Sequence, residues 1–207
     1  AFIGWKSDDN QMTIATANDG DSIVLQTGNK VTRMVLDDNS RISLTNNDGG
    51  STTGTNTVFG KLAGNALASG GNNNVLIGED AGNDLTTSDH NVAIGFQAFA
   101  KATTRADNNT VVGNYAMGSI VSNDVNDCVV LGYNAIGLGV MEAGASGVVA
   151  VGRDALKSLT SGDGNVALGF ESAKSMTTGA RNVVIGYQAG DAMTVATRSV
   201  AIRSVTL

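Results

Sequence analysis

A short apolar phrase recurs along most of the chain, and its clearest copy reads Asn-Val-Ala-Ile-Gly-Phe-Gln-Ala over residues 91–98. Its glycine returns at intervals of 17 to 20 residues. A ninth copy, Ser-Val-Ala-Ile over residues 199–202, has Arg203 at the glycine position. Such fixed spacing indicates a repeat architecture. The glycines are Gly60, Gly78, Gly95, Gly113, Gly132, Gly152, Gly169 and Gly186.

Each interval holds a second apolar position seven residues after the glycine, as in Leu85-Thr-Thr-Ser. Turn-forming residues separate the two apolar segments, and neither segment is long enough for a helix. The unit therefore predicts one coil of an all-β, parallel β-solenoid (β-roll) with a period of about 18. A single coil cannot close a core, so coils must stack at about 4.8 Å. Nine coils would form a rod of roughly 40 Å.

Two polar or small positions keep register with the glycine. We expect the asparagines to form side-chain ladders and to cap turns. We expect the glycines to form a sharp corner with positive φ, with the alanines packed inside that corner. These columns are interpreted as structural. Apart from the glycines, they contain Asn56, Asn74, Asn91, Asn109, Asn165 and Asn182, and Ala63, Ala81, Ala98, Ala116, Ala135, Ala155 and Ala189.

The strand itself offers two faces. Alternation places the positions one and three before the glycine, such as Val75 and Ile77, on one face, which we assign to the core. The position between them is apolar in all nine copies, which indicates that the outer face is covered too. Identical chains are the simplest cover, so we expect a homotrimer. The expected trimer interface is Val58, Leu76, Ala93, Val111, Val130, Ala150, Ala167, Val184 and Ala201.

Aromatic residues stand just after several of the repeat glycines. Rigid rings with a polar tip make good anchors for sugars and partner proteins, so these are the candidate receptor contacts. The alternative is that they cover the coil corner or pack between chains. The five residues are Phe96, Tyr115, Tyr133, Phe170 and Tyr187.

Residues 1–50 do not follow the period. Their short apolar clusters alternate with turn-forming clusters such as Asn-Asp-Gly-Asp over residues 18–21. This pattern predicts a β-meander or a β-prism shaft segment. We therefore divide the chain into an N-terminal strand segment, 1–50, and a solenoid domain, 51–207.

Composition narrows the function. Proline is absent from 207 residues, as expected where nearly every backbone N–H is needed for pairing. A net charge of −6 argues against nucleic-acid binding and against docking to anionic lipid. The apolar stretch 135–152 carries Glu142 and belongs to the repeat, so we expect no membrane insertion. A lone Cys128 and a lone His90 exclude an internal disulfide and a multi-histidine metal site.

The sequence gives little support for an enzymatic function. Hexapeptides such as Ile-Gly-Glu-Asp-Ala-Gly over residues 77–82 resemble those of left-handed β-helix acyltransferases, with His90 as the base. Only one hexapeptide per coil fits, and the spacing drifts to 19 and 20 residues. The aspartates sit mostly in turns, with no pair spaced for glycoside hydrolysis. We therefore expect no catalysis, no cofactor and no metal.

The repeats at residues 91–98 and 182–189, joined by Leu-Thr-Thr connectors, resemble those of tail fibres and tail spikes of tailed bacteriophages. They are also similar to the head repeats of trimeric autotransporter adhesins. Residues 33–44 resemble a segment that precedes such repeats in phage fibres. The resemblance implies a trimeric virion tail-fibre segment that contacts other tail or fibre proteins and a bacterial surface receptor, a glycan among the candidates. The alternative it implies is an adhesin head on a bacterial cell surface.

Overall fold

The computed structural model describes residues 55–67, 71–102, 105–120, 124–138 and 145–203 in full. Before residue 55 it describes only the backbone of five strands. The chain divides into two compact units, Ala1–Asn47 and Asp48–Leu207.

The first unit contains two separate antiparallel sheets. Strands β1 and β2 form one, and strands β3, β4 and β5 form the other, with a register shift between Leu25 and Gln26. Antiparallel pairing agrees with a strand-rich segment, while the meander or prism arrangement stays a prediction. The strands are β1 Phe2–Lys6, β2 Gln11–Ala15, β3 Ile23–Thr27, β4 Val31–Leu36 and β5 Ile42–Ser43.

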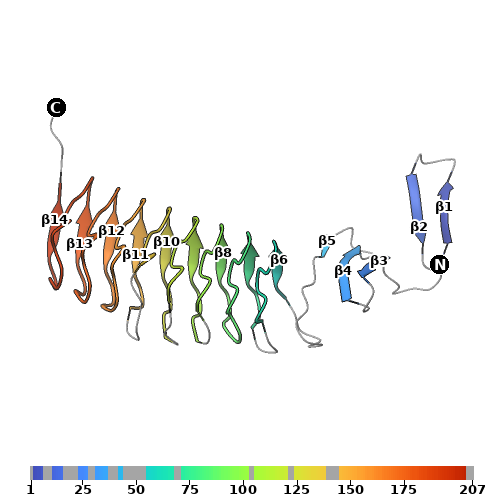
Figure 1. Cartoon of the computed structure of the whole chain (residues 1–207), viewed down its shortest axis with the longest axis horizontal. Coiled ribbons are helices and arrows are strands. Elements are labelled where there is room, and N and C mark those ends of the chain that lie inside the picture. Colours follow the sequence, from blue (N-terminus) through green and yellow to red (C-terminus); the bar gives the residue numbers. More distant parts are fainter. Residues whose placement is uncertain are drawn as a thin grey trace. The chain divides into compact units, whose positions relative to one another are not determined.

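The second unit is a parallel β-solenoid with a period of about 18, as the repeat predicted. Nine three-residue strands stack in chain order into one parallel sheet (Figure 1). Each middle residue pairs with the middle residue of the next strand, as Ala93 does with Val111. No helix occurs in the part of the chain that is described. The strands are β6 Thr57–Phe59, β7 Val75–Ile77, β8 Val92–Ile94, β9 Thr110–Val112, β10 Val129–Leu131, β11 Val149–Val151, β12 Val166–Leu168, β13 Val183–Ile185 and β14 Val200–Ile202.

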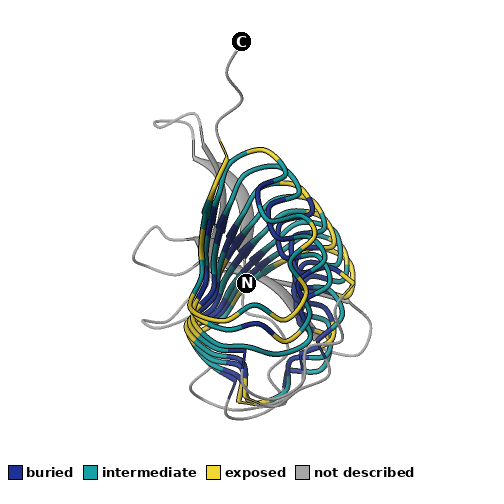
Figure 2. Ribbon diagram, turned by 90° about the vertical axis from the view of Figure 1, so that its left-hand side faces the viewer, coloured by how far each residue is buried: buried dark blue, intermediate teal, exposed yellow. Residues whose placement is uncertain are grey.

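The two faces of this sheet are the reverse of those expected. The middle residue of β7 to β13 is buried inside the coil, whereas its two neighbours are half-buried or exposed (Figure 2). The assignment of this stripe to a trimer interface is therefore wrong, because its side chains line the interior. The corrected residues are Val58, Leu76, Ala93, Val111, Val130, Ala150, Ala167, Val184 and Ala201.

Side-chain packing inside the coil accounts for this choice of faces. The rest of the coil buries large side chains of its own, including Phe99, Met117 and Leu156. Where the middle of the strand carries the large Leu76, glycine stands beside it: a Cβ on Gly64 or on Gly82 would lie 2.8 Å from a Leu76 side-chain carbon. Close packing to interior density requires this pairing of large with small.

The corner glycines have φ between +120° and +143°, a conformation that side chains rarely adopt. Each also faces the corresponding residue of the next coil. A Cβ on Gly132 would lie 2.6 Å from the carbonyl oxygen of Gly152. The ninth copy has no further strand stacked on it among the described residues, and there Arg203 replaces the glycine.

The asparagine column forms hydrogen-bonded ladders inside the turns. The side-chain amide of Asn91 donates to Asn74 Oδ1 at 3.1 Å, and that of Asn109 donates to Asn91 Oδ1 at 3.1 Å. Each Oδ1 also accepts the backbone N–H one coil further on, as Asn91 Oδ1 does from Asn109 at 2.9 Å. The ladder stops where Cys128 and Val148 occupy the position, and it resumes at Asn165. Buried amides are thereby satisfied along the stack.

Candidate functional site

Just beyond the corner glycines, side chains from six consecutive coils touch in sequence. Phe96 and Tyr115 meet edge to face with ring centroids 5.2 Å apart, and Tyr115 meets Tyr133 at 6.0 Å. Phe170 and Tyr187 are stacked at 5.2 Å. The three tyrosines are exposed, with Tyr187 at 53%. We call this set the aromatic ridge: Phe96, Tyr115, Tyr133, Arg153, Phe170 and Tyr187.

Arg153 joins the two halves of the ridge. Its guanidinium carbon lies 5.6 Å from the ring centroids of both Tyr133 and Phe170. Its Nε also donates to Asp154 Oδ2 at 3.1 Å. Cation–π contact at this distance is favourable. All five predicted receptor-contact residues thus lie on one line, and the sequence reasoning missed Arg153 because it counted only aromatic side chains.

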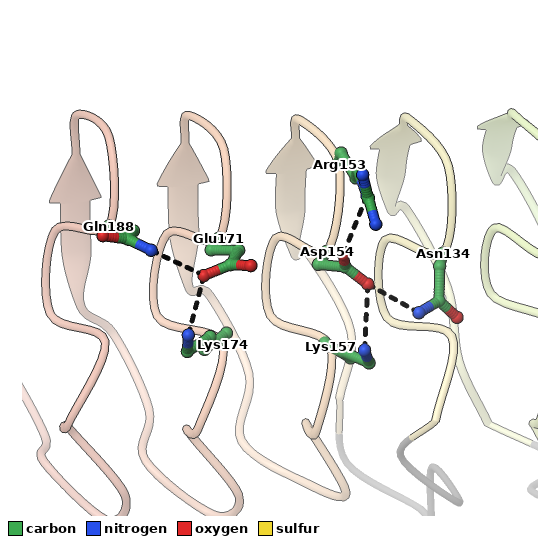
Figure 3. Close-up of polar contacts among 7 residues, drawn as sticks. All are labelled: Asn134, Arg153, Asp154, Lys157, Glu171, Lys174 and Gln188. Atoms are coloured by element: carbon green, nitrogen blue, oxygen red, sulfur yellow. Dashed lines mark hydrogen bonds and ion pairs between the residues drawn. The ribbon is translucent and has the colours of Figure 1, made fainter.

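Beside the ridge lies a polar column two residues after the glycine (Figure 3). Asp154, almost buried, accepts from the Asn134 amide at 2.6 Å and pairs with Lys157 at 3.1 Å. Burial alone would raise the pKa of Asp154, but the Asn134 hydrogen bond and the Lys157 and Arg153 charges hold it below its usual value.

One coil further on, a carboxylate again pairs with a lysine and accepts from an amide, but this amide comes from the following coil and not from the preceding one. Glu171 pairs with Lys174 at 2.7 Å and accepts from Gln188 at 2.9 Å. The hydrogen bond from Lys174, and then that from Gln188, lower the pKa of Glu171, while Glu171 raises the pKa of Lys174. Figure 3 shows the two amides, Asn134 and Gln188, on the outer sides of the two carboxylates.

This column holds its charges in pairs. Both carboxylates are ionised with a lysine three residues later, so neither provides a protonated acid for catalysis. The sequence signal was available, since Asp154 with Lys157 and Glu171 with Lys174 repeat the same spacing from their glycines. Among the described residues, no three His, Cys, Asp or Glu side chains gather in a way that could hold a metal ion.

The two remaining chemical candidates are inert or exposed. Cys128 is buried, and desolvation is the main cause that raises its pKa to about 11, so the thiol is protonated near neutral pH. His90 is an exposed turn residue with φ +60°, and its ring nitrogen lies 3.2 Å from the Asn73 amide.

A third surface is the outer sheet face, made of the first and third residues of β6 to β14. Sixteen of its eighteen side chains are apolar, and the other two are Thr57 and Thr110. None is charged. Val129 is 37% exposed, and Val200 at the end of the stack is 71% exposed. The outer sheet face therefore presents a continuous aliphatic strip along the solenoid.

Comparison with known proteins does not extend this picture. No family model matches the chain, and neither the curated proteins nor the solved structures contain a significant match. No helix in the described part of the chain is long and apolar enough to cross a bilayer. What the chain does must therefore be inferred from the solenoid and its surfaces.

Proposed function

We propose that this chain is a non-enzymatic segment of a trimeric virion fibre, such as a phage tail fibre. It acts as a stiff spacer and presents a surface for attachment to the host. The proposal combines the resemblance of the repeats at 91–98 and 182–189 to phage fibre repeats with one structural observation, the uncharged aliphatic strip on the outer sheet face.

The strip is a sizeable exposed apolar patch. Nine strands at about 4.8 Å spacing, with two side-chain columns about 7 Å apart, give an area of about 300 Å². This is within the size range of the largest apolar patch on a typical monomer, which is often functional. Three strips packed about a common axis bury about 900 Å², so residues that flank the strip must contribute as well to reach the roughly 1,000 Å² of a specific interface. Because every copy presents the same strip, the chain can be its own partner.

Molar mass tests the proposal. Light scattering coupled to size exclusion should give about three times 21.0 kDa for the wild-type chain. Val166→Asp places a carboxylate on the outer sheet face of β12 and should shift the mass towards the monomer. Asn114→Asp adds the same charge at an exposed corner and should leave the mass unchanged. A wild-type monomer would overturn the proposal, as would a Val166→Asp variant that stays trimeric.

A further inference from the structure

We propose that the aromatic ridge binds an extended neutral polysaccharide that lies along the solenoid. The inference rests on the proposed function for its setting, since it names the chemical class to which the fibre attaches.

The ridge repeats with the coil. One ring or guanidinium is contributed by each of six consecutive coils, and the ring centroids lie 5.2 to 6.0 Å apart. Five of the six directly follow the corner glycine, and Tyr115 stands one residue later. At about 4.8 Å a coil, the ridge extends over about 24 Å. A surface that offers one such group per coil favours a ligand that is itself a repeating polymer, because each added unit gains a further contact of the same kind.

The side chains match carbohydrate chemistry. The exposed rings of Tyr115, Tyr133 and Tyr187 offer apolar carbon for the C–H faces of sugars and a phenolic hydroxyl for sugar hydroxyls. The rings are also held in place before any ligand binds. Phe96 packs against Tyr115, and Phe170 packs against Tyr187, so little side-chain freedom is lost on binding.

The charge of the ridge favours a neutral polymer. Its one cation, Arg153, is already engaged by Asp154 and by the rings of Tyr133 and Phe170. The neighbouring Asp154 and Glu171 are each paired with a lysine, and the whole chain carries a net charge of −6. A polyanion therefore finds no unpaired cation on the ridge, and the net charge of the chain opposes its approach. In the first two coils, the residue directly after the glycine is charged, and Lys61 and Glu79 form an ion pair there. The aromatic ridge starts in the next coil, with Phe96.

Affinity electrophoresis provides the test, with native gels that contain dextran, mannan, laminarin or the polyanion alginate. At least one of the three neutral polymers should retard the wild-type chain, and alginate should not. Tyr133→Ala and Tyr187→Ala should each weaken that retardation by about tenfold. Tyr133→Phe keeps the ring and should retain most of it. Leu138→Ala, a change at a residue 63% exposed and outside the ridge, should behave like wild type.

Each other outcome decides against the ridge as a polysaccharide site. No retardation by any of the neutral polymers overturns the proposal, and so does stronger retardation by alginate. A Tyr133→Ala variant that keeps its full retardation also overturns the proposal. A Tyr133→Ala variant that instead changes molar mass shows that the ridge is a contact between copies of the chain. The fibre proposal is tested separately by molar mass. A trimer that no neutral polymer retards contradicts only the polysaccharide proposal, and a monomer that is retarded contradicts only the fibre proposal.

Discussion

Gly132 and Gly152 lie so close that a Cβ on the first would come within 2.6 Å of the carbonyl oxygen of the second. The same relationship links each corner glycine to the next coil, so the backbone of one coil rests directly on that of its neighbour. Positive φ and close approach act together here, and both require glycine.

Gly132→Ala should therefore destabilise the solenoid by about 3 kcal/mol or more, from backbone strain plus the clash. Gly164→Ala is the matched control, because Gly164 also has positive φ, at +65°, but its Cβ would meet only the Arg181 side chain at 3.6 Å. It should cost about 1 kcal/mol. Urea unfolding measures both, and equal losses would contradict the role given to coil-to-coil approach.

Asn91 tests the amide ladder. Replacement by alanine removes its bond to Asn74 and leaves the buried N–H groups of Asn109 without their acceptor. We expect a loss of about 2 to 4 kcal/mol in the free energy of unfolding. Asn114→Ala, at an exposed residue with one backbone partner, should cost less than about 1 kcal/mol. A small effect at Asn91 would show that water can replace the ladder.

Asp154 gives the solenoid a dependence on acid. Its pKa is lowered in the folded chain, so its contribution is complete above the unfolded value of 3.8 and is lost as pH falls through the lower folded value. Asp154→Asn should lose about 1 to 3 kcal/mol at pH 7 and show a flatter stability profile below pH 4. Asp163→Asn, at an exposed ion pair with Arg181, should change little. Unfolding in urea from pH 3 to pH 7 separates the two.

Cys128 should resist alkylation in the native state. Burial and a pKa of about 11 leave little thiolate at pH 8, so iodoacetamide should react only after unfolding in urea. In a Cys128→Ala, Leu138→Cys variant the thiol is exposed and should react within minutes under native conditions. Rapid labelling of native Cys128 would contradict its placement in the core.

The repeat allowed the stacking to be predicted, because glycine, asparagine and alanine in fixed register have few other physical explanations. The faces could not be predicted in the same way. Val92, Ala93 and Ile94 are all apolar, so alternation alone permits either side to be the interior. The side of the strand that faces the buried side chains of the rest of the coil, such as Phe99, becomes the interior, and that side is known only once the coil is closed.

The polar column and the complete ridge were missed for a related reason. Asp154 was counted with the aspartates of turns, although its partner Asn134 comes from the preceding coil. Arg153 carries a charge, and its contacts with Tyr133 and Phe170 depend on stacking of the coils. Contacts between side chains of neighbouring coils can be identified only once the register in which the coils stack is known.

The gap in the amide ladder has a mechanical consequence. Between the coils of β10 and β11, Cys128 and Val148 interrupt the interior amides, while Asn134 with Asp154 and Tyr133 with Arg153 bridge these same coils at the surface. These coils are therefore joined partly by the charged side chains of Asp154 and Arg153. Acid protonates Asp154 and so weakens its contact with Asn134, whereas it leaves the buried amides of the other coils unchanged. The stiffness of the solenoid at these coils should therefore depend on pH.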